Sequence, residues 1–164
     1  MKIFWCYARR DDRPPRKKVS KLREAFETVL SQVLGEDCVI YMDKITLNWG
    51  VEWRKEIERL INESDGFVAI VTPSFFNSRM CIFELQMAFK ADKKILPIYF
   101  RNCSRGLKST FKEDGIEAEI NKELNKASIR IGNIQMKDFR KLRNEKLDSQ
   151  KVEDFLDKMA EDVT

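Results

Sequence analysis

Short apolar runs alternate along this chain with longer segments in which apolar residues recur every three or four positions. The short runs are typical of strands buried on both faces of a parallel sheet, and the longer spacing is typical of helices with one buried face. The expected strands are residues 2–7, 38–42, 67–71, 95–100 and, interrupted by Gly132-Asn133, 129–136. This alternation predicts an α/β fold of the flavodoxin-like kind, with three layers and a five-stranded parallel sheet in the order 2-1-3-4-5 flanked by helices.

The helices are expected from the apolar ladders between these strands. The ladders run from Val19 to Val33, from Trp53 to Ile61, from Ile82 to Phe89 and from Val152 to Val163, and an irregular helix is expected at 116–124. Gly35 is expected to end the first of them. The charged segment at 8–16 and the segment at 43–50 are expected to form loops.

The segment from the third expected strand into its helix holds the most informative polar residues. Thr72-Pro73-Ser74 ends the strand, because proline cannot donate to the sheet ladder. Ser78 is an N-cap candidate for the following helix, and Glu84 lies in its opening turns. Open α/β sheets bind ligands at the carboxyl ends of their strands, so Glu84 is expected close to such a crevice. From position alone, Glu84 is more simply read as a surface residue favoured by the helix dipole.

The composition of the chain limits the number of domains and the kinds of catalytic and metal sites that it can contain. The 164 residues, 43% hydrophobic and 35% charged, fit one globular domain, which we expect to be a module of a longer protein. No apolar run approaches the roughly 20 residues that span a bilayer and no signal peptide is apparent, so a cytoplasmic chain is expected. The chain has no histidine and its four cysteines lack ligand spacing, which argues against a metal site and excludes every His-based triad.

The net charge of +4 is modest, but six basic residues cluster after the first expected strand. They are Arg9, Arg10, Arg13, Arg16, Lys17 and Lys18. Such a cluster either contacts phosphate or forms a solvated surface. Arg9 and Arg10 follow the strand directly and lie on the ligand side of such a sheet, where a guanidinium suits pyrophosphate. No aromatic-basic platform is visible, so nucleic acid is not an expected partner.

Three segments of the chain resemble the boxes of the TIR (Toll/interleukin-1 receptor) domain family, especially its bacterial members. The first is IFWCYARRDD, with Cys6-Tyr7 where the family usually has Ser-Tyr. The second runs from Asp43 to Trp53 and resembles the BB loop, with Gly50 and Trp53 at its Gly-x-x-Trp. The third matches the family's Ser-x-Trp-Cys-x-x-Glu-Leu box at Ser78, Cys81, Glu84 and Leu85, with Met80 where tryptophan is common.

The resemblance implies an enzyme that cleaves NAD+ into nicotinamide and ADP-ribose or a cyclic ADP-ribose, and it makes Glu84 the catalytic residue. NAD+ would be the substrate, and no cofactor is expected. The candidate substrate-binding residues are Tyr7, Ala8, Arg9, Arg10, Asp43, Trp49, Phe75, Ser78, Met80 and Cys81. Several of these residues have an alternative, purely structural role. Asp43 could cap its loop, and Phe75 could cover the end of the sheet. The nearby Trp53 is more simply a core anchor than a ligand platform.

The resemblance also implies homo-oligomerisation through TIR–TIR contacts, a fused or separate ligand-sensing domain, and a role in bacterial antiviral defence. An alternative is an interaction module that signals by assembly and has no enzymatic activity. A phospho-receiver domain shares the fold order and would use Asp11-Asp12, but Thr72-Pro73 stands where a receiver has the aspartate that ends its third strand.

Overall fold

The computed structural model describes residues 1–42, 51–103 and 111–164. Its centre is a five-stranded parallel sheet in the order β2-β1-β3-β4-β5. The strands are β1 (Lys2–Cys6), β2 (Val39–Met42), β3 (Gly66–Val71), β4 (Lys94–Tyr99) and β5 (Lys137–Asp138). The predicted flavodoxin-like fold and strand order are confirmed.

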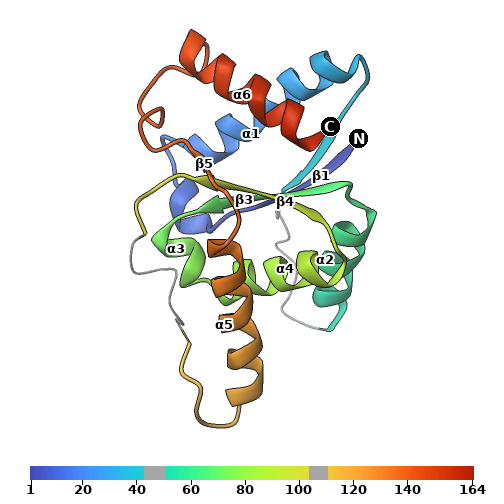
Figure 1. Cartoon of the computed structure of the whole chain (residues 1–164), viewed down its shortest axis with the longest axis vertical. Coiled ribbons are helices and arrows are strands. Elements are labelled where there is room, and N and C mark those ends of the chain that lie inside the picture. The colour runs from blue at the N-terminus through green and yellow to red at the C-terminus, as the bar shows by residue number, and fades with distance from the viewer. Residues whose placement is uncertain (43–50, 104–110) are drawn as a thin grey trace.

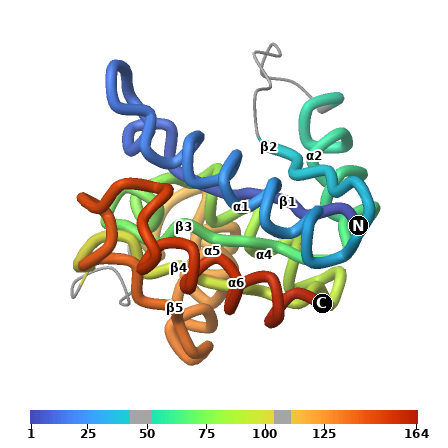
Figure 2. Tube along the Cα trace, turned by 90° about the horizontal axis from the view of Figure 1, so that it is seen from above, coloured from blue at the N-terminus to red at the C-terminus, as the bar shows by residue number. Residues whose placement is uncertain are grey.

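Helices cover both faces of the sheet (Figure 1). On one face lie α1 (Lys18–Leu34) and α6 (Gln150–Val163), and on the other lie α2 (Val51–Glu63), α4 (Arg79–Lys90) and α5 (Ala118–Gly132). Two short helices, η1 (Arg9–Asp12) and α3 (Pro73–Phe76), follow the carboxyl ends of β1 and β3. Figure 2 shows α1 and α6 side by side over the sheet, with both chain termini at the opposite end of the molecule from η1.

The domain has two hydrophobic cores, one on each face of the sheet, and the central strand β3 contributes to both. All six of its residues are buried, because helices cover both of its faces. Val68 and Ile70 point toward α1 and α6, and Phe67, Ala69 and Val71 belong to the core beneath α2 and α4. In the second core the rings of Phe4 and Phe67 stack at 5.5 Å.

Both helix-end predictions are confirmed. Gly35 ends α1 with a φ of 68°, and its N–H donates to the carbonyl oxygen of Ser31 at 2.9 Å. Ser78 caps α4, because its Oγ accepts a hydrogen bond from the Cys81 N–H at 3.2 Å. Of the expected α4 ladder, Phe89 is only half-buried, and the guanidinium of Arg130 lies 4.1 Å from its ring centre.

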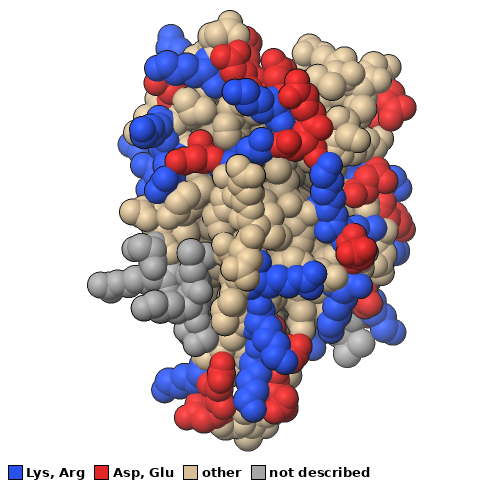
Figure 3. All heavy atoms as spheres, viewed as in Figure 1, with Lys and Arg blue, Asp and Glu red and all other residues tan. Residues whose placement is uncertain are grey.

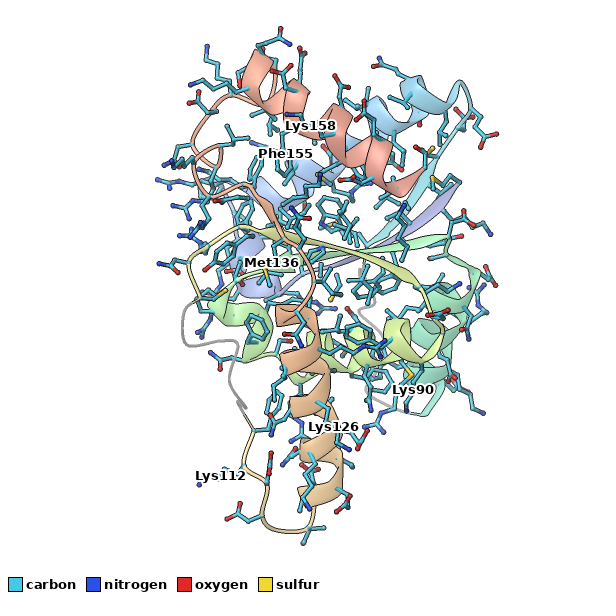
Figure 4. All side chains as sticks on the ribbon, viewed as in Figure 1. Lys90, Lys112, Lys126, Met136, Phe155 and Lys158 are labelled. Carbon is cyan, nitrogen blue, oxygen red and sulfur yellow. The ribbon has the colours of Figure 1, made fainter. Side chains whose placement is uncertain are left out.

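The predicted fifth strand at 129–136 is wrong. Its first four residues form the last turn of α5, which extends well past the irregular helix expected at 116–124. The helical spacing explains the difference: Leu124, Ala127 and Ile131 share the face that packs in the core with α4, while Ile129 is 48% exposed. The strand that completes the sheet, β5, begins directly after Met136, which Figure 4 shows at the level of the sheet.

Two of the expected connections also contain short helices. The charged segment at 8–16 holds η1. The Thr72-Pro73-Ser74 turn starts α3, since proline at the first helical position leaves no donor unpaired and Thr72 caps the helix. Both helices lie at the end of the sheet where a ligand is expected.

Candidate functional site at the sheet edge

The carboxyl ends of β1 and β3 are joined by side-chain hydrogen bonds. Thr72, directly after β3, donates from Oγ1 to the Asp11 Oδ2 at 2.5 Å and accepts from the Phe75 N–H at 3.0 Å. The neighbouring Asp12 accepts from the Ser20 N–H at 2.9 Å and from the Ser20 hydroxyl. Thus η1 is fixed to β3 on one side and to α1 on the other.

Glu84 lies in the second turn of α4 and is only 2% exposed. It interacts with the side chain of Cys6, the last residue of β1. The Cys6 thiol in turn donates to the Cys81 carbonyl oxygen at 3.7 Å, which places the opening turn of α4 against the end of β1. Burial raises the pKa of the Cys6 thiol well above its usual value, and the hydrogen bond to Cys81 and the charge of Glu84 act in the same direction.

The predicted residues that follow β1 gather at this same edge of the sheet. Tyr7 is half-buried and Ala8 is 5% exposed, and both come directly after the strand. Arg9 and Arg10 are exposed on η1. A parallel sheet brings the residues after β1 and β3 to one end, so these side chains and α4 border a common region.

The predicted residues of α3 and α4 are less accessible. Phe75 is fully buried and packs edge-on against Phe76 at 5.5 Å, so its ring presents no surface to a ligand here. Cys81 is 2% exposed, while Ser78 and Met80 are half-buried. Ser78 already serves as the cap of α4.

Asp43 and Trp49 lie outside the described residues, and their assignments stay predictions. Trp53, which follows them in the BB-loop resemblance, is 9% exposed, and its ring lies 5.9 Å from that of Phe83. It anchors α2 to α4, as its helical spacing predicts.

Comparison with known proteins assigns the family. The profile of the TIR domain family matches residues 3–150. The chain belongs to the TIR domain family. A solved structure of TIR domains, from the activated Roq1 resistosome that directly recognises the pathogen effector XopQ, is similar over 99% of both chains, with a TM-score of 0.64 and 16% sequence identity. At that identity the likeness shows the shared fold. No curated protein matches the chain.

Sequence reasoning missed the positioning role of Thr72, Asp11 and Asp12 in this TIR domain. The sequence suggests for Asp11-Asp12 only a receiver-type acidic pair, whereas in the structure both carboxylates accept hydrogen bonds that fix η1. The Thr-Pro pair at the end of β3 carried the available signal, because threonine before a first-turn proline is a typical helix cap.

Across residues 1–42, 51–103 and 111–164 no cluster of three His, Cys, Asp or Glu side chains could hold a metal ion. All four cysteines are buried and free of disulfides. Among the described parts of this TIR domain, no helix is both long and apolar enough to cross a membrane.

Proposed function

We propose that this TIR domain cleaves the N-glycosidic bond between nicotinamide and ribose in NAD+, releasing nicotinamide and ADP-ribose or a cyclic ADP-ribose. The observation that carries the proposal is the position of Glu84: a carboxylate 2% exposed, beside the end of β1, in the box where the TIR family carries its catalytic glutamate. Glu84 would be the catalytic residue, and no cofactor would be needed.

A single carboxylate suffices for this reaction. Nicotinamide in NAD+ is a cationic leaving group that departs neutral with the bonding electron pair, so no general acid is required, in contrast to ordinary glycosides. The remaining task is to stabilise the positive charge that develops on the ribose. Glu84 would do so by its charge and by accepting hydrogen bonds from the ribose hydroxyls. Water would then attack the anomeric carbon and lose a proton to give ADP-ribose. In the cyclising reaction an adenine nitrogen or a ribose hydroxyl of the same molecule would attack this carbon instead.

The surroundings of Glu84 favour this role. The thiol of Cys6 at the end of β1 interacts with Glu84, and Cys81 lies one turn earlier in α4; both cysteines are nearly inaccessible to water. In such a low-dielectric setting a carboxylate interacts with a developing cation more strongly than it would in water. The raised pKa of Cys6 keeps that thiol neutral, so it does not add a competing negative charge.

The burial of Glu84 also bears on activation. NAD+ cannot reach a carboxylate that is 2% exposed unless neighbouring groups move. We infer that association with other copies of the domain opens the site, in line with the assembled state named for the similar Roq1 TIR domains. A fused or separate sensing domain would drive that association in the cytoplasm, and bacterial antiviral defence is the proposed setting.

The test is nicotinamide release from NAD+ by clustered protein, measured by product chromatography, for the wild type and for Glu84→Gln. Loss of a preorganised electrostatic contact of this kind costs about 3–4 kcal/mol, so we expect roughly a hundredfold to thousandfold slower release. Glu58→Gln, an exposed carboxylate on α2, is the matched control and should release nicotinamide at the wild-type rate. Equal melting temperatures would show that the loss is chemical. Intact NAD+ after incubation with the clustered wild type would contradict the proposal.

A second candidate is an interaction module that acts only by assembly. The observation that favours it is a set of exposed apolar side chains on and beside α5: Ile116 is 106%, Ile120 53% and Ile129 48% exposed. This candidate predicts oligomers that Ile120→Lys weakens, together with no NAD+ consumption in any assembled state. Sedimentation of the wild type and of Ile120→Lys measures the assembly, and the nicotinamide-release assay on the same two proteins separates the two functions.

A further inference from the structure

A hollow lies at the carboxyl end of the sheet, on the face covered by α1 and α6. Its volume is about 340 Å³. It is bounded by the start of α1, the end of β4 and the segment between β5 and α6. Cavities of this size accept small organic ligands.

Four cationic side chains line this hollow: Arg16, Lys18, Lys21 and Arg143. Arg101 is close enough that its charge acts on both Lys18 and Arg143. Within the described residues, none of these five cations forms an ion pair with a carboxylate. Glu145 also lines the hollow, but it pairs with Lys151 at 3.3 Å. Figure 3 shows Lys and Arg side chains gathered at the left edge of the upper layer, beside the segment that leads to α6.

Two of the cations, Lys18 and Arg143, are held in place by hydrogen bonds, whereas Arg16 and Lys21 are exposed. The Lys18 Nζ donates to the Arg143 carbonyl oxygen and to the Asn144 Oδ1, each at 2.8 Å. Arg143 donates to the Phe100 carbonyl oxygen at 3.4 Å. Burial lowers the pKa of Lys18, and the neighbouring arginines lower it further. Burial and Arg101 likewise lower the pKa of Arg143. The positive charges therefore repel one another, and a bound anion would relieve that repulsion.

The floor of the hollow is apolar. The rings of Phe100 and Phe139 stack at 5.7 Å in the core beneath it. Leu142 and Leu147 are half-buried at its wall and leave part of their surface open. A ligand that fits both features carries a phosphate and a flat or apolar group.

We propose that this hollow binds a nucleotide, with its phosphates on Arg16, Lys18, Lys21 and Arg143 and its base against Leu142 and Leu147. Guanidinium groups bind phosphate through paired hydrogen bonds, and lysine adds a compact charge. The site is separate from the one around Glu84, because the sheet lies between them: Phe100, Phe139 and the two leucines belong to the core under α1 and α6, and Cys6 and Cys81 belong to the opposite core. The proposal therefore does not depend on cleavage of NAD+.

The experiment is calorimetric titration of the whole chain with ADP, adenosine and inorganic pyrophosphate. ADP should bind, adenosine should give no measurable heat, and pyrophosphate should bind more weakly than ADP. The double variant Arg16→Glu/Lys21→Glu should weaken ADP binding by roughly tenfold or more, because it replaces two charge-assisted contacts with repulsive ones. Both side chains are exposed, so the fold is expected to tolerate the change.

The matched control is Lys55→Glu/Lys158→Glu, which changes the net charge equally on exposed positions of α2 and α6; Figure 4 marks Lys158 on α6. It should bind ADP as the wild type does, and an equal loss would reduce the effect to overall charge and overturn the site. Glu84→Gln should also bind ADP as the wild type does. If this variant lost ADP binding, the ADP site would lie around Glu84 and not in the hollow. Equal affinity for pyrophosphate and ADP would overturn the nucleotide assignment. Tighter binding of a ten-nucleotide single strand than of ADP would overturn a small-ligand site in favour of a nucleic-acid surface.

Discussion

The thiol of Cys6 donates a hydrogen bond to the carbonyl oxygen of Cys81 across 3.7 Å, joining the end of β1 to the first turn of α4. Both residues are buried, and Glu84 lies one helical turn beyond Cys81 beside the same thiol. The position of the candidate catalytic carboxylate therefore depends on packing between two segments 75 residues apart in the sequence.

The burial of the Cys6 thiol, reinforced by its contacts with Cys81 and Glu84, predicts a loss of stability at alkaline pH. The pKa of Cys6 is raised in the folded state, so the folded protein holds that proton more tightly than the unfolded chain does. The stabilisation is complete below the unfolded thiol pKa of about 8.5 and is lost as the pH rises toward the folded value. We expect the free energy of unfolding to fall above about pH 8.5 by up to about 1.4 kcal/mol per pH unit from this thiol.

Urea unfolding of the wild type and Cys6→Ala at several pH values isolates this contribution. The quantity to compare is the slope of the unfolding free energy against pH. Subtracting the slope of Cys6→Ala from that of the wild type removes the contribution of the lysines, the tyrosines and Cys103. The pKa of Cys103 is also raised by burial. Parallel stability curves for the two proteins above pH 8.5 would show that Cys6 does not titrate differently on folding.

The pair of Asp138 and Arg140, at the end of the edge strand β5, predicts the opposite pH dependence. The Arg140 guanidinium hydrogen-bonds both carboxylate oxygens of Asp138, at 2.9 and 2.7 Å, and lowers the pKa of Asp138 to about 2. The stabilisation is present above the unfolded pKa of about 3.9 and disappears as the pH falls toward 2. Asp138 is about half exposed, at 47%, so we expect solvent screening to hold the contribution below about 1 kcal/mol.

Carbon-detected NMR titration of the Asp138 carboxyl group checks this pair directly. Arg140→Gln should raise the measured pKa of Asp138 toward its ordinary value, and Lys141→Gln should move it much less because Lys141 contributes only through its charge. A wild-type Asp138 that titrates near 3.9 would contradict the geometry of the pair.

The layers of this domain could be predicted from the sequence because strands β1 to β4 and the longer helices each carry their own hydrophobic pattern. β3 is apolar throughout and α1 repeats every three or four residues, so both elements were found within one or two residues of their ends. The prediction at 129–136 was wrong because Ile129 and Ile131 alternate as in a strand, whereas the contact between α5 and α4 buries the side chains of Leu124, Ala127 and Ile131 at helical spacing. β5 is two residues long and has no apolar run to reveal it.

The candidate site was predictable in part for a different reason. Cap and box residues are local, so Ser78 and Glu84 could be placed on α4 from the sequence. The contacts that set the site are not local: Cys6 meets Cys81 and Asp11 meets Thr72, 75 and 61 residues away, respectively. The cationic hollow is likewise built from residues far apart in the sequence. The predicted basic cluster contains Arg16 and Lys18, but it does not reveal that Arg143 joins them.

The core at α6 gives a direct test of packing. Leu156 lies on the buried face of α6 and is 1% exposed, so Leu156→Ala should lower the free energy of unfolding by about 2–5 kcal/mol, since it removes buried methyl groups and leaves a cavity. Ile116→Ala, at a side chain 106% exposed, should change it by less than about 0.5 kcal/mol. Urea unfolding measures both, and similar losses for the two variants would contradict the assigned core.

Thr72 offers the sharpest test of how the sheet edge is held together. Its hydroxyl donates to Asp11 and accepts from the Phe75 N–H, and the residue is fully buried. Thr72→Val keeps the shape but leaves a buried N–H and a carboxylate oxygen without that partner, so we expect a loss of about 1–3 kcal/mol in the free energy of unfolding. Thr72→Ser keeps the hydroxyl and should recover most of the hydrogen-bond contribution, losing only the burial of one methyl group. If the serine variant is no more stable than the valine variant, the hydroxyl does not join η1 to β3, and the edge that borders Glu84 is held by packing alone.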